Sequence, residues 1–155
     1  MLLISMLSFF NIIFSYYFDL FLNVNNYAYT FVFSLLIGLL LIFFKNFNFR
    51  KIDIYEKVLL VIFGFLFFPL IISIPFYFSI SNISFLNCYF EAISGFTSTG
   101  FTIFDNIKQL DQSLLIWRST SQWIGGLYFL FSLLLLIDIF EIGRAHVWTP
   151  VTDQS

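Results

Sequence analysis

Residues 81–102 read SNISFLNCYFEAISGFTSTGFT, and this stretch decides how the chain is expected to fold. Asn82 or Ser84 can cap a helix at its start, and Gly95 can end that helix. About eleven residues at 1.5 Å per residue give a helix of roughly 16 Å, which is too short to cross a bilayer and fits a re-entrant helix. The apolar residues that recur at the spacing of one helix face are Phe85, Leu86, Tyr89, Phe90 and Ile93.

The second half of this stretch is small and polar. Non-helical backbone at membrane depth is tolerated only where it lines water or is buried in protein. Carbonyl oxygens of such backbone replace the water shell of the ion in K⁺ filters, and Gly100 can adopt the positive φ that turns its carbonyl toward a pore. The negative end of the preceding helix dipole also favours a cation. The alternative interpretation is an ordinary external loop.

We therefore predict a K⁺ selectivity filter built mainly from backbone carbonyls. Side-chain hydroxyls in the loop can bond to neighbouring backbone and hold the loop open. The predicted ligand residues are Thr97, Ser98, Thr99 and Gly100, with Phe101, Thr102, Glu91 and Arg118 in supporting positions.

The composition places the chain among membrane proteins. Its 155 residues are 60% hydrophobic and 10% charged, whereas a soluble domain carries about 25% charged residues. Four windows approach the roughly 20 apolar residues of a membrane span, at about 2–22, 27–44, 58–80 and 114–140. We predict an all-α membrane protein with two N-terminal transmembrane helices (1–44), a loop (45–57) and one helix–pore loop–helix repeat (58–140).

The loop at 45–57 sets the expected orientation. Short loops rich in Lys and Arg remain in the cytoplasm, so residues 81–113 should face outside. Pro69 and Pro75 fall in the third window, where we expect them to be tolerated in a membrane helix. The basic residues of the loop are Lys45, Arg50, Lys51 and Lys57.

Several classes of function have no support in the sequence. No basic stripe favours nucleic acid binding, and one cysteine, Cys88, gives no disulfide framework. The one histidine, His146, lies in the tail discussed below, so neither a Cys/His metal cluster nor a Ser-His-Asp arrangement is expected. We expect no enzymatic activity and no cofactor.

Two charged residues in apolar surroundings need an explanation. Arg118 opens the fourth window, where an arginine either snorkels to the interface or pairs with a carboxylate, here Glu91. Glu91 is expected to bond to the pore loop backbone. Gly125 and Gly126 are expected to permit close packing of helices.

Two blocks resemble the Trk/Ktr/HKT potassium transporter superfamily. Residues 89–102, YFEAISGFTSTGFT, resemble the first pore loop of the bacterial Trk branch, which typically reads FEAxSGxTTTGAT. Residues 114–126, LLIWRSTSQWIGG, resemble the LLxWRSxxQWxGG signature that opens the next helix. The resemblance covers about residues 1–140. The departures are Ser98 for Thr, Phe101 for Ala, and Tyr128 where the superfamily often has Met-Gly.

The resemblance implies four non-identical span–pore loop–span repeats around one pore, of which this chain would carry the first. It implies K⁺ uptake across the bacterial plasma membrane by the pore subunit of a Trk-type transporter. The implied partners are K⁺, the lipid bilayer, a second full-length subunit in a homodimer, and a cytoplasmic nucleotide-binding regulatory subunit.

The last fifteen residues, 141–155, read EIGRAHVWTPVTDQS and do not continue this pattern. We expect them to be translated sequencing adapter and the chain to be an N-terminal fragment that forms no selective pore alone. Two other functions stay open. A small channel could assemble from four copies of the single loop, and a membrane anchor or assembly protein would tolerate substitution of Gly100.

Overall fold

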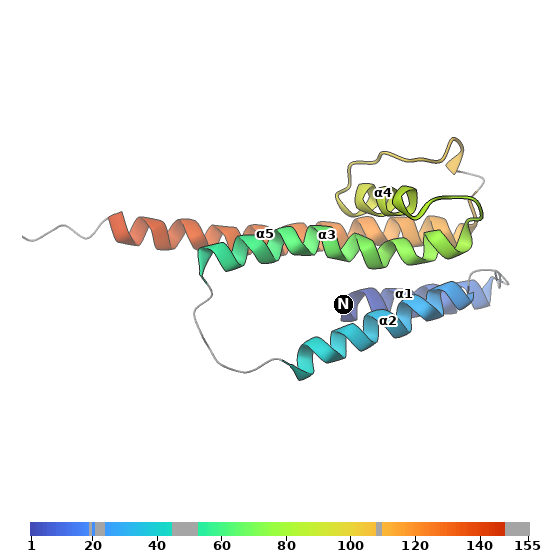
Figure 1. The fold of residues 1–155 in the computed structure, drawn as a ribbon, viewed down its shortest axis with the longest axis horizontal. Coiled ribbons are helices and arrows are strands. Elements are labelled where there is room, and N and C mark those ends of the chain that lie inside the picture. Colours follow the sequence, from blue (N-terminus) through green and yellow to red (C-terminus); the bar gives the residue numbers. More distant parts are fainter. Residues whose placement is uncertain (19, 21–23, 45–52, 108–109, 148–155) are drawn as a thin grey trace, which may run out of the picture.

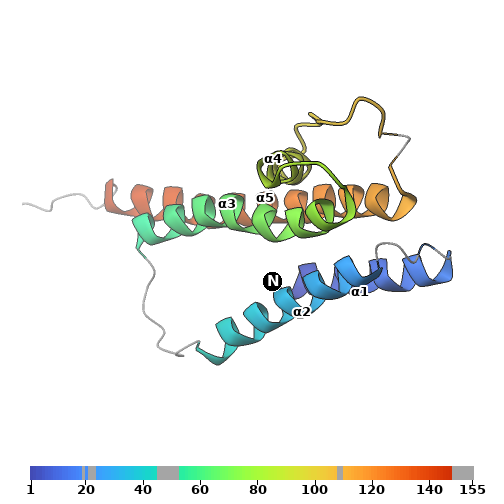
Figure 2. The same ribbon diagram turned by 45° about the vertical axis from the view of Figure 1, so that its right-hand side comes forward.

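The computed structural model describes the chain except for residues 19, 21–23, 45–52, 108–109 and 148–155. The regular secondary structure of the described residues is helical throughout, without a strand, which confirms the predicted all-α class. The helices are α1 (Leu2–Tyr17), α2 (Val24–Phe43), α3 (Ile54–Ser79), α4 (Phe85–Phe96) and α5 (Gln112–Val147). The short α4 lies on one side of α3 and α5, and the α1–α2 hairpin lies on the other side (Figures 1 and 2).

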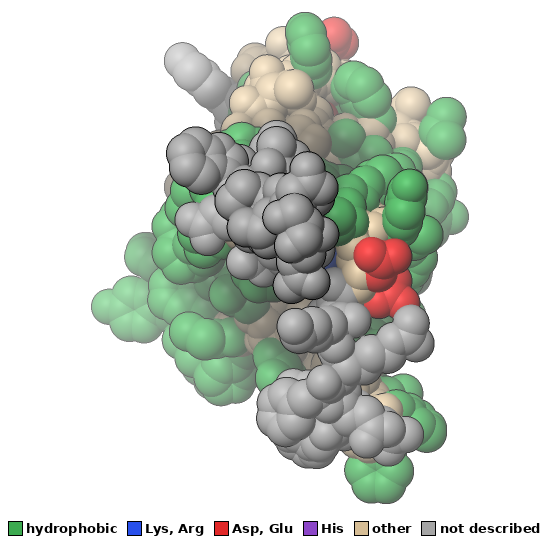
Figure 3. All heavy atoms as spheres, turned by 90° about the vertical axis from the view of Figure 1, so that its left-hand side faces the viewer, with side chains coloured by type: hydrophobic (Ala, Val, Ile, Leu, Met, Phe, Trp, Pro, Cys, Tyr) green, Lys and Arg blue, Asp and Glu red, His purple; other side chains and the backbone are tan. Residues whose placement is uncertain are grey.

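Three described helices are long and apolar enough to cross a membrane, namely Val24–Phe43, Ile54–Ser79 and Gln112–Ile137. Hydrophobic side chains spread over the visible flanks of the described helices (Figure 3). The first helix ends at Tyr17, short of the predicted window, and α5 continues past residue 140 to Val147. Residues 45–52 of the predicted cytoplasmic loop and 148–155 of the tail lie outside the described residues.

Helix α3 begins at a capping box. The Asp53 carboxylate accepts a hydrogen bond from the amide of Ile54 at 2.8 Å, and the Glu56 carboxylate accepts one from the amide of Asp53 at 3.1 Å. Exposed Tyr55 and Tyr77 stand near the two ends of the helix, about 33 Å apart along its axis. Tyrosine is enriched at both membrane interfaces, so this spacing fits a helix that crosses about 30 Å of hydrocarbon.

Both prolines are accommodated inside α3, as expected. A proline removes a backbone donor and disturbs the preceding turn, and side chains of neighbouring helices can satisfy the carbonyls that this leaves. The carbonyl that loses its amide donor lies four residues before each proline, and a side-chain donor from α4 or α5 reaches the adjacent carbonyl, three residues before each proline. The pairs are Tyr89 Oη to the Leu66 carbonyl at 2.9 Å and Trp117 Nε1 to the Ile72 carbonyl at 3.0 Å.

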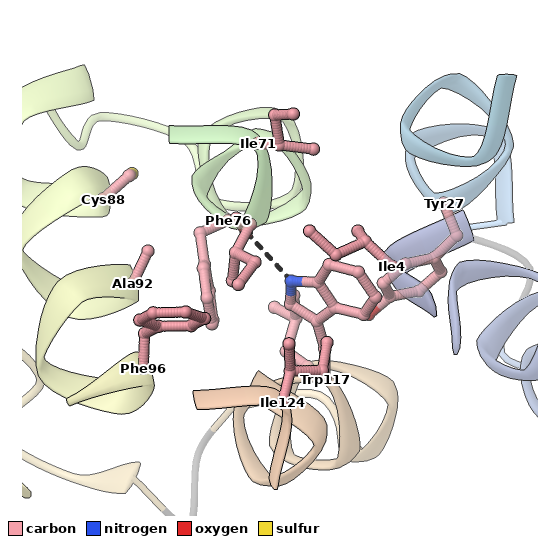
Figure 4. Packing of buried hydrophobic residues seen from close by; sticks show 11 residues of the cluster. Ile4, Tyr27, Ile71, Phe76, Cys88, Ala92, Phe96, Trp117 and Ile124 are labelled. Carbon is pink, nitrogen blue, oxygen red and sulfur yellow. Dashed lines mark hydrogen bonds between the residues drawn. The ribbon is translucent and has the colours of Figure 1, made fainter. Parts of the chain in front are cut away.

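The core centres on Trp117, whose side chain lies between α3 and the α1–α2 hairpin (Figure 4). Its indole is 1% exposed and its ring lies 5.7 Å from that of Tyr27 on α2. On the other side of α3, Cys88, Ala92 and Phe96 present one buried face of α4 (Figure 4). Trp117 therefore connects the hairpin to the helices that carry the polar loop.

The crossing of α4 and α5 depends on one glycine. A Cβ atom at Gly125 would overlap the carbonyl group of Phe96, whereas a Cβ atom at Gly126 would meet no neighbour within 4 Å. The expectation that both glycines permit close packing is therefore confirmed for Gly125 and wrong for Gly126. The two residues point to different sides of α5, and α4 covers one of them.

We expect Gly125→Ala to destabilise the protein by about 1–3 kcal/mol, because the added methyl group forces α4 away from α5. Gly126→Ala is the matched control, since it makes the same change on the open side of the same helix. Thermal unfolding of the two variants in detergent micelles tests this. Equal transition temperatures would show that α4 does not pack on Gly125.

We expect Trp117→Phe to cost about 1–3 kcal/mol, because it leaves the buried Ile72 carbonyl without its side-chain donor. Trp123→Phe is the control, since Trp123 lies on the same helix with 61% of its surface exposed. The measurement is the same thermal transition, and a loss at Trp117 no larger than that at Trp123 would contradict the role of the indole.

Candidate cation-binding loop

Helix α4 presents the polar loop. The Ser84 hydroxyl accepts a hydrogen bond from the amide of Asn87 at 3.3 Å, so Ser84 is the cap among the two predicted candidates. Asn82 instead takes a left-handed conformation with φ of 70° in the preceding turn. The helix ends at Phe96, one residue beyond the predicted Gly95. Its 12 residues span about 18 Å, which fits the predicted half-length helix.

The backbone amides that follow α4 bond back to its last turn. This arrangement uses the N–H groups of the loop and the carbonyl groups at the end of the helix. The hydroxyl of Thr97 adds a bond of 2.8 Å to the carbonyl of Ile93. The backbone pairs are Thr97 to Ile93 at 2.8 Å, Ser98 to Gly95 at 3.0 Å and Thr99 to Ser94 at 3.1 Å.

The carbonyl oxygens of residues 97–100 are in the opposite situation. Within the described part of the chain, no donor bonds to any of these four oxygens, and all four residues are exposed. The next carbonyl, that of Phe101, accepts a bond of 2.6 Å from the Ser94 hydroxyl. Unpaired carbonyl groups at membrane depth are costly unless a ligand or water supplies a partner. These oxygens are therefore available to a cation.

Two residues of the loop have positive φ. Gly100 has φ of 82°, as predicted, and no atom lies within 4 Å of where its Cβ would stand. Ser98 has φ of 56°, which the sequence did not indicate. Left-handed conformations of residues other than glycine are uncommon and gather at functional sites.

The segment after Gly100 is held by the buried carboxylate of Glu91. This carboxylate accepts hydrogen bonds from the Thr102 hydroxyl at 3.0 Å and from the amide of Ile103 at 3.0 Å. Arg118 Nε donates to its other oxygen at 2.6 Å. The expected bonding of Glu91 to loop backbone is confirmed, and Arg118 pairs with Glu91. That Glu91 and Arg118 support a filter stays a prediction.

One side of the loop is open. A hollow of about 470 Å³ adjoins Thr97 and Ser98, and its other lining residues are Phe65, Phe96, Gly125, Gly126 and Phe129. Phe101 is exposed and stands clear of the core. Ser94 bonds to loop residues on both sides of Gly100. It was not predicted as a site residue from the sequence, because no spacing rule relates a serine in a helix to residues that follow a turn.

Side chains do not supply a metal site in the part of the chain that is described. There, no three His, Cys, Asp or Glu residues gather in a way that could hold a metal ion. A cation at this loop would be bound by oxygens of the backbone and of hydroxyl groups.

The comparisons with known proteins point to one group. An uncharacterized cation transporter of Methanocaldococcus jannaschii is 44% identical over 54 residues, which are 35% of this chain and 11% of that protein. The Trk system potassium uptake protein TrkI of Halomonas elongata is 30% identical over 84 residues, 54% of this chain and 17% of that protein. TrkH of Escherichia coli is 30% identical over 89 residues, 54% of this chain and 18% of that protein.

The matched segments thus span less than a fifth of these relatives. No solved structure matches the chain. A family described as cation transport protein, TrkH, matches residues 23–148, which include the loop, all of α3 to α5 and the first residues of the tail. Because this match covers most of the chain, the chain belongs to the TrkH family of cation transport proteins.

Proposed function

We propose that this chain takes part in K⁺ uptake as a pore-forming segment of a Trk-type transporter. The carbonyl groups of residues 97–100 coordinate dehydrated K⁺ in this proposal. The observation that carries it is the run of four exposed residues, 97–100, whose carbonyl oxygens lack a partner in the described part, while the amides of the first three bond to α4. Names of two relatives, potassium uptake proteins of the Trk system, give the choice of ion.

The arrangement suits a dehydrated monovalent cation. Ligand oxygens must replace the water that the ion loses, and several must do so at once. The C-terminal end of α4 precedes the loop directly and adds a partial negative charge of about half an elementary charge. Glu91, in contrast, is bonded to Arg118, so its charge is compensated behind the loop and does not face the ion as a lone anion.

One loop can surround only one side of an ion. We propose that the intact protein contains three further repeats and that this chain is the first, with 141–155 derived from adapter sequence. On the same superfamily resemblance we propose a homodimer of full-length subunits in the bacterial plasma membrane and a cytoplasmic nucleotide-binding regulatory subunit. The length of the relatives beyond the matched segments is consistent with further repeats.

The ion pair of Glu91 and Arg118 affects the stability of the protein, because each charge needs the other as a partner. Glu91 is fully buried and the Arg118 side chain is 14% exposed, so either charge alone would stand in apolar surroundings. Removing one member of such a pair leaves an uncompensated charge, which costs about 3–5 kcal/mol. Replacing both members leaves no charge and costs less.

We expect Gly100→Ala in the full-length protein to lower the preference for K⁺ over Na⁺ by about tenfold. The Cβ atom has space, but φ of 82° strains any residue with a side chain by about 1–2 kcal/mol and shifts the carbonyl ligands. The measurement is ion uptake in bacteria that lack their own K⁺ uptake systems. Ser34→Ala on α2 is the control, because the Ser34 hydroxyl bonds to the Phe31 carbonyl of its own helix, away from the loop.

An unchanged ion preference and uptake rate for Gly100→Ala would contradict the filter. That outcome fits an ordinary external loop or a membrane anchor.

We expect Glu91→Gln and Arg118→Gln each to reduce the amount of folded protein in the membrane sharply, and the double variant to recover part of that loss. The reason is that each single variant keeps one buried charge and the double variant keeps none. Protein content of purified membranes and double-mutant analysis of the thermal transition measure this coupling. Purely additive losses would show that the two charges do not stabilise each other.

A further inference from the structure

Ser94 makes contacts on both sides of Gly100. It lies in the last turn of α4 and is 3% exposed. Its hydroxyl donates to the carbonyl of Phe101 at 2.6 Å. Its own carbonyl accepts the amide of Thr99 at 3.1 Å, and Thr99 Oγ1 lies 3.2 Å from that carbonyl and 3.3 Å from Ser94 Oγ.

These bonds explain where the run of unpaired carbonyls ends. A serine hydroxyl has one proton to donate, and at 2.6 Å this proton goes to Phe101. The carbonyl of Phe101 is thereby turned toward α4 and withdrawn from a cation, whereas the carbonyl of Gly100 has no partner in the described part. The pairing of the carbonyl groups thus changes between two adjacent residues, and Ser94 supplies the donor on one side of that change.

Beyond the glycine, Glu91 bonds to Thr102 and Ile103, and between these anchors the tip of the loop has few contacts. Gly100 has no atom within 4 Å of its Cβ position, so packing does not fix its conformation. Its φ of 82° is then maintained by bonds to its two neighbours. Ser94 bonds to both Thr99 and Phe101, and the distance between these two residues constrains the torsions of the glycine between them.

We infer that Ser94 is a positioning residue for ion selectivity. It would fix the end of the coordinating run at Gly100 and hold the carbonyls of Thr99 and Gly100 in the directions that distinguish K⁺ from Na⁺. The inference rests on the proposed filter, and it assigns a residue of α4 that does not touch the ion.

The test compares Ser94→Ala, Ser94→Thr and Ser121→Ala in the full-length protein. Ser121 is an apt control, because it is a buried serine of the same pore unit whose hydroxyl bonds only to the Arg118 carbonyl of its own helix, at 2.6 Å. The readout is the concentration of Na⁺ that halves K⁺ uptake, with the amount of protein in the membrane measured in parallel.

We expect Ser94→Ala to reduce the K⁺ preference about five- to tenfold, which corresponds to the loss of one buried hydrogen bond. Ser94→Thr keeps the hydroxyl and should stay near the parent, as should Ser121→Ala. A merely structural role would lower the amount of protein and leave the ion preference of the remaining molecules unchanged, and that result would overturn the inference. An equal loss of preference in Ser121→Ala would overturn it too.

If Ser94→Ala does not reach the membrane, Ser94→Cys carries the test, because it keeps a side chain of similar shape and replaces the hydroxyl donor to the Phe101 carbonyl by a weak thiol donor. An unchanged preference in Ser94→Cys would then overturn the inference. The Gly100→Ala variant tests the filter proposal independently of Ser94. A changed preference in Gly100→Ala beside an unchanged one in Ser94→Ala rejects the role of Ser94 and retains the filter.

Discussion

The carboxylate of Glu91 joins three segments of the chain that are distant in sequence. It lies on α4, it accepts bonds from the segment that follows Gly100, and it pairs with Arg118 on α5. A buried carboxylate is stable only while its oxygens keep these partners. The position of α5 and the path of the chain after the loop are therefore coupled to α4 through one group. The loop between them gains a defined shape without a packed core of its own.

In the proposed filter, two opposing demands would meet in residues 97–100. Backbone at membrane depth must have its polar groups satisfied, whereas a cation filter needs free carbonyls. The structure separates the two kinds of group: the amides of Thr97, Ser98 and Thr99 bond to the end of α4, and the carbonyls are left over. Left-handed conformations at Ser98 and Gly100 fit this separation, because they alter the direction of successive peptide groups. The strain of Ser98 is then a cost of exposing oxygen atoms.

Sequence reasoning found the features that depend on near neighbours. The half-length helix followed from periodicity and a cap at Ser84, and the positive φ of Gly100 followed from its lack of a side chain. The pairing of Arg118 with Glu91 was one of two alternatives, since a sequence does not show how far apart two helices lie. Which of Gly125 and Gly126 faces α4 depends on the rotation of α5, and the bond from Trp117 to Ile72 joins residues 45 apart. Such relations require the packed arrangement.

The unit of α3, α4 and α5 has packed faces and one open side. On its packed faces, α4 packs on α3, and carbonyls near Pro69 and Pro75 receive donors from Tyr89 and Trp117. On the open side, the carbonyls of residues 97–100 lack a donor in the described part and the hollow beside Thr97 and Ser98 borders Gly126. Side-chain donors thus reach carbonyls of the proline-containing span, whereas in the described part none reaches the carbonyls of residues 97–100. The hydroxyl groups of Thr97, Thr99 and Thr102 bond to α4 instead. The unpaired oxygens are thus a property of how the loop is held, which is the condition that a cation ligand must meet.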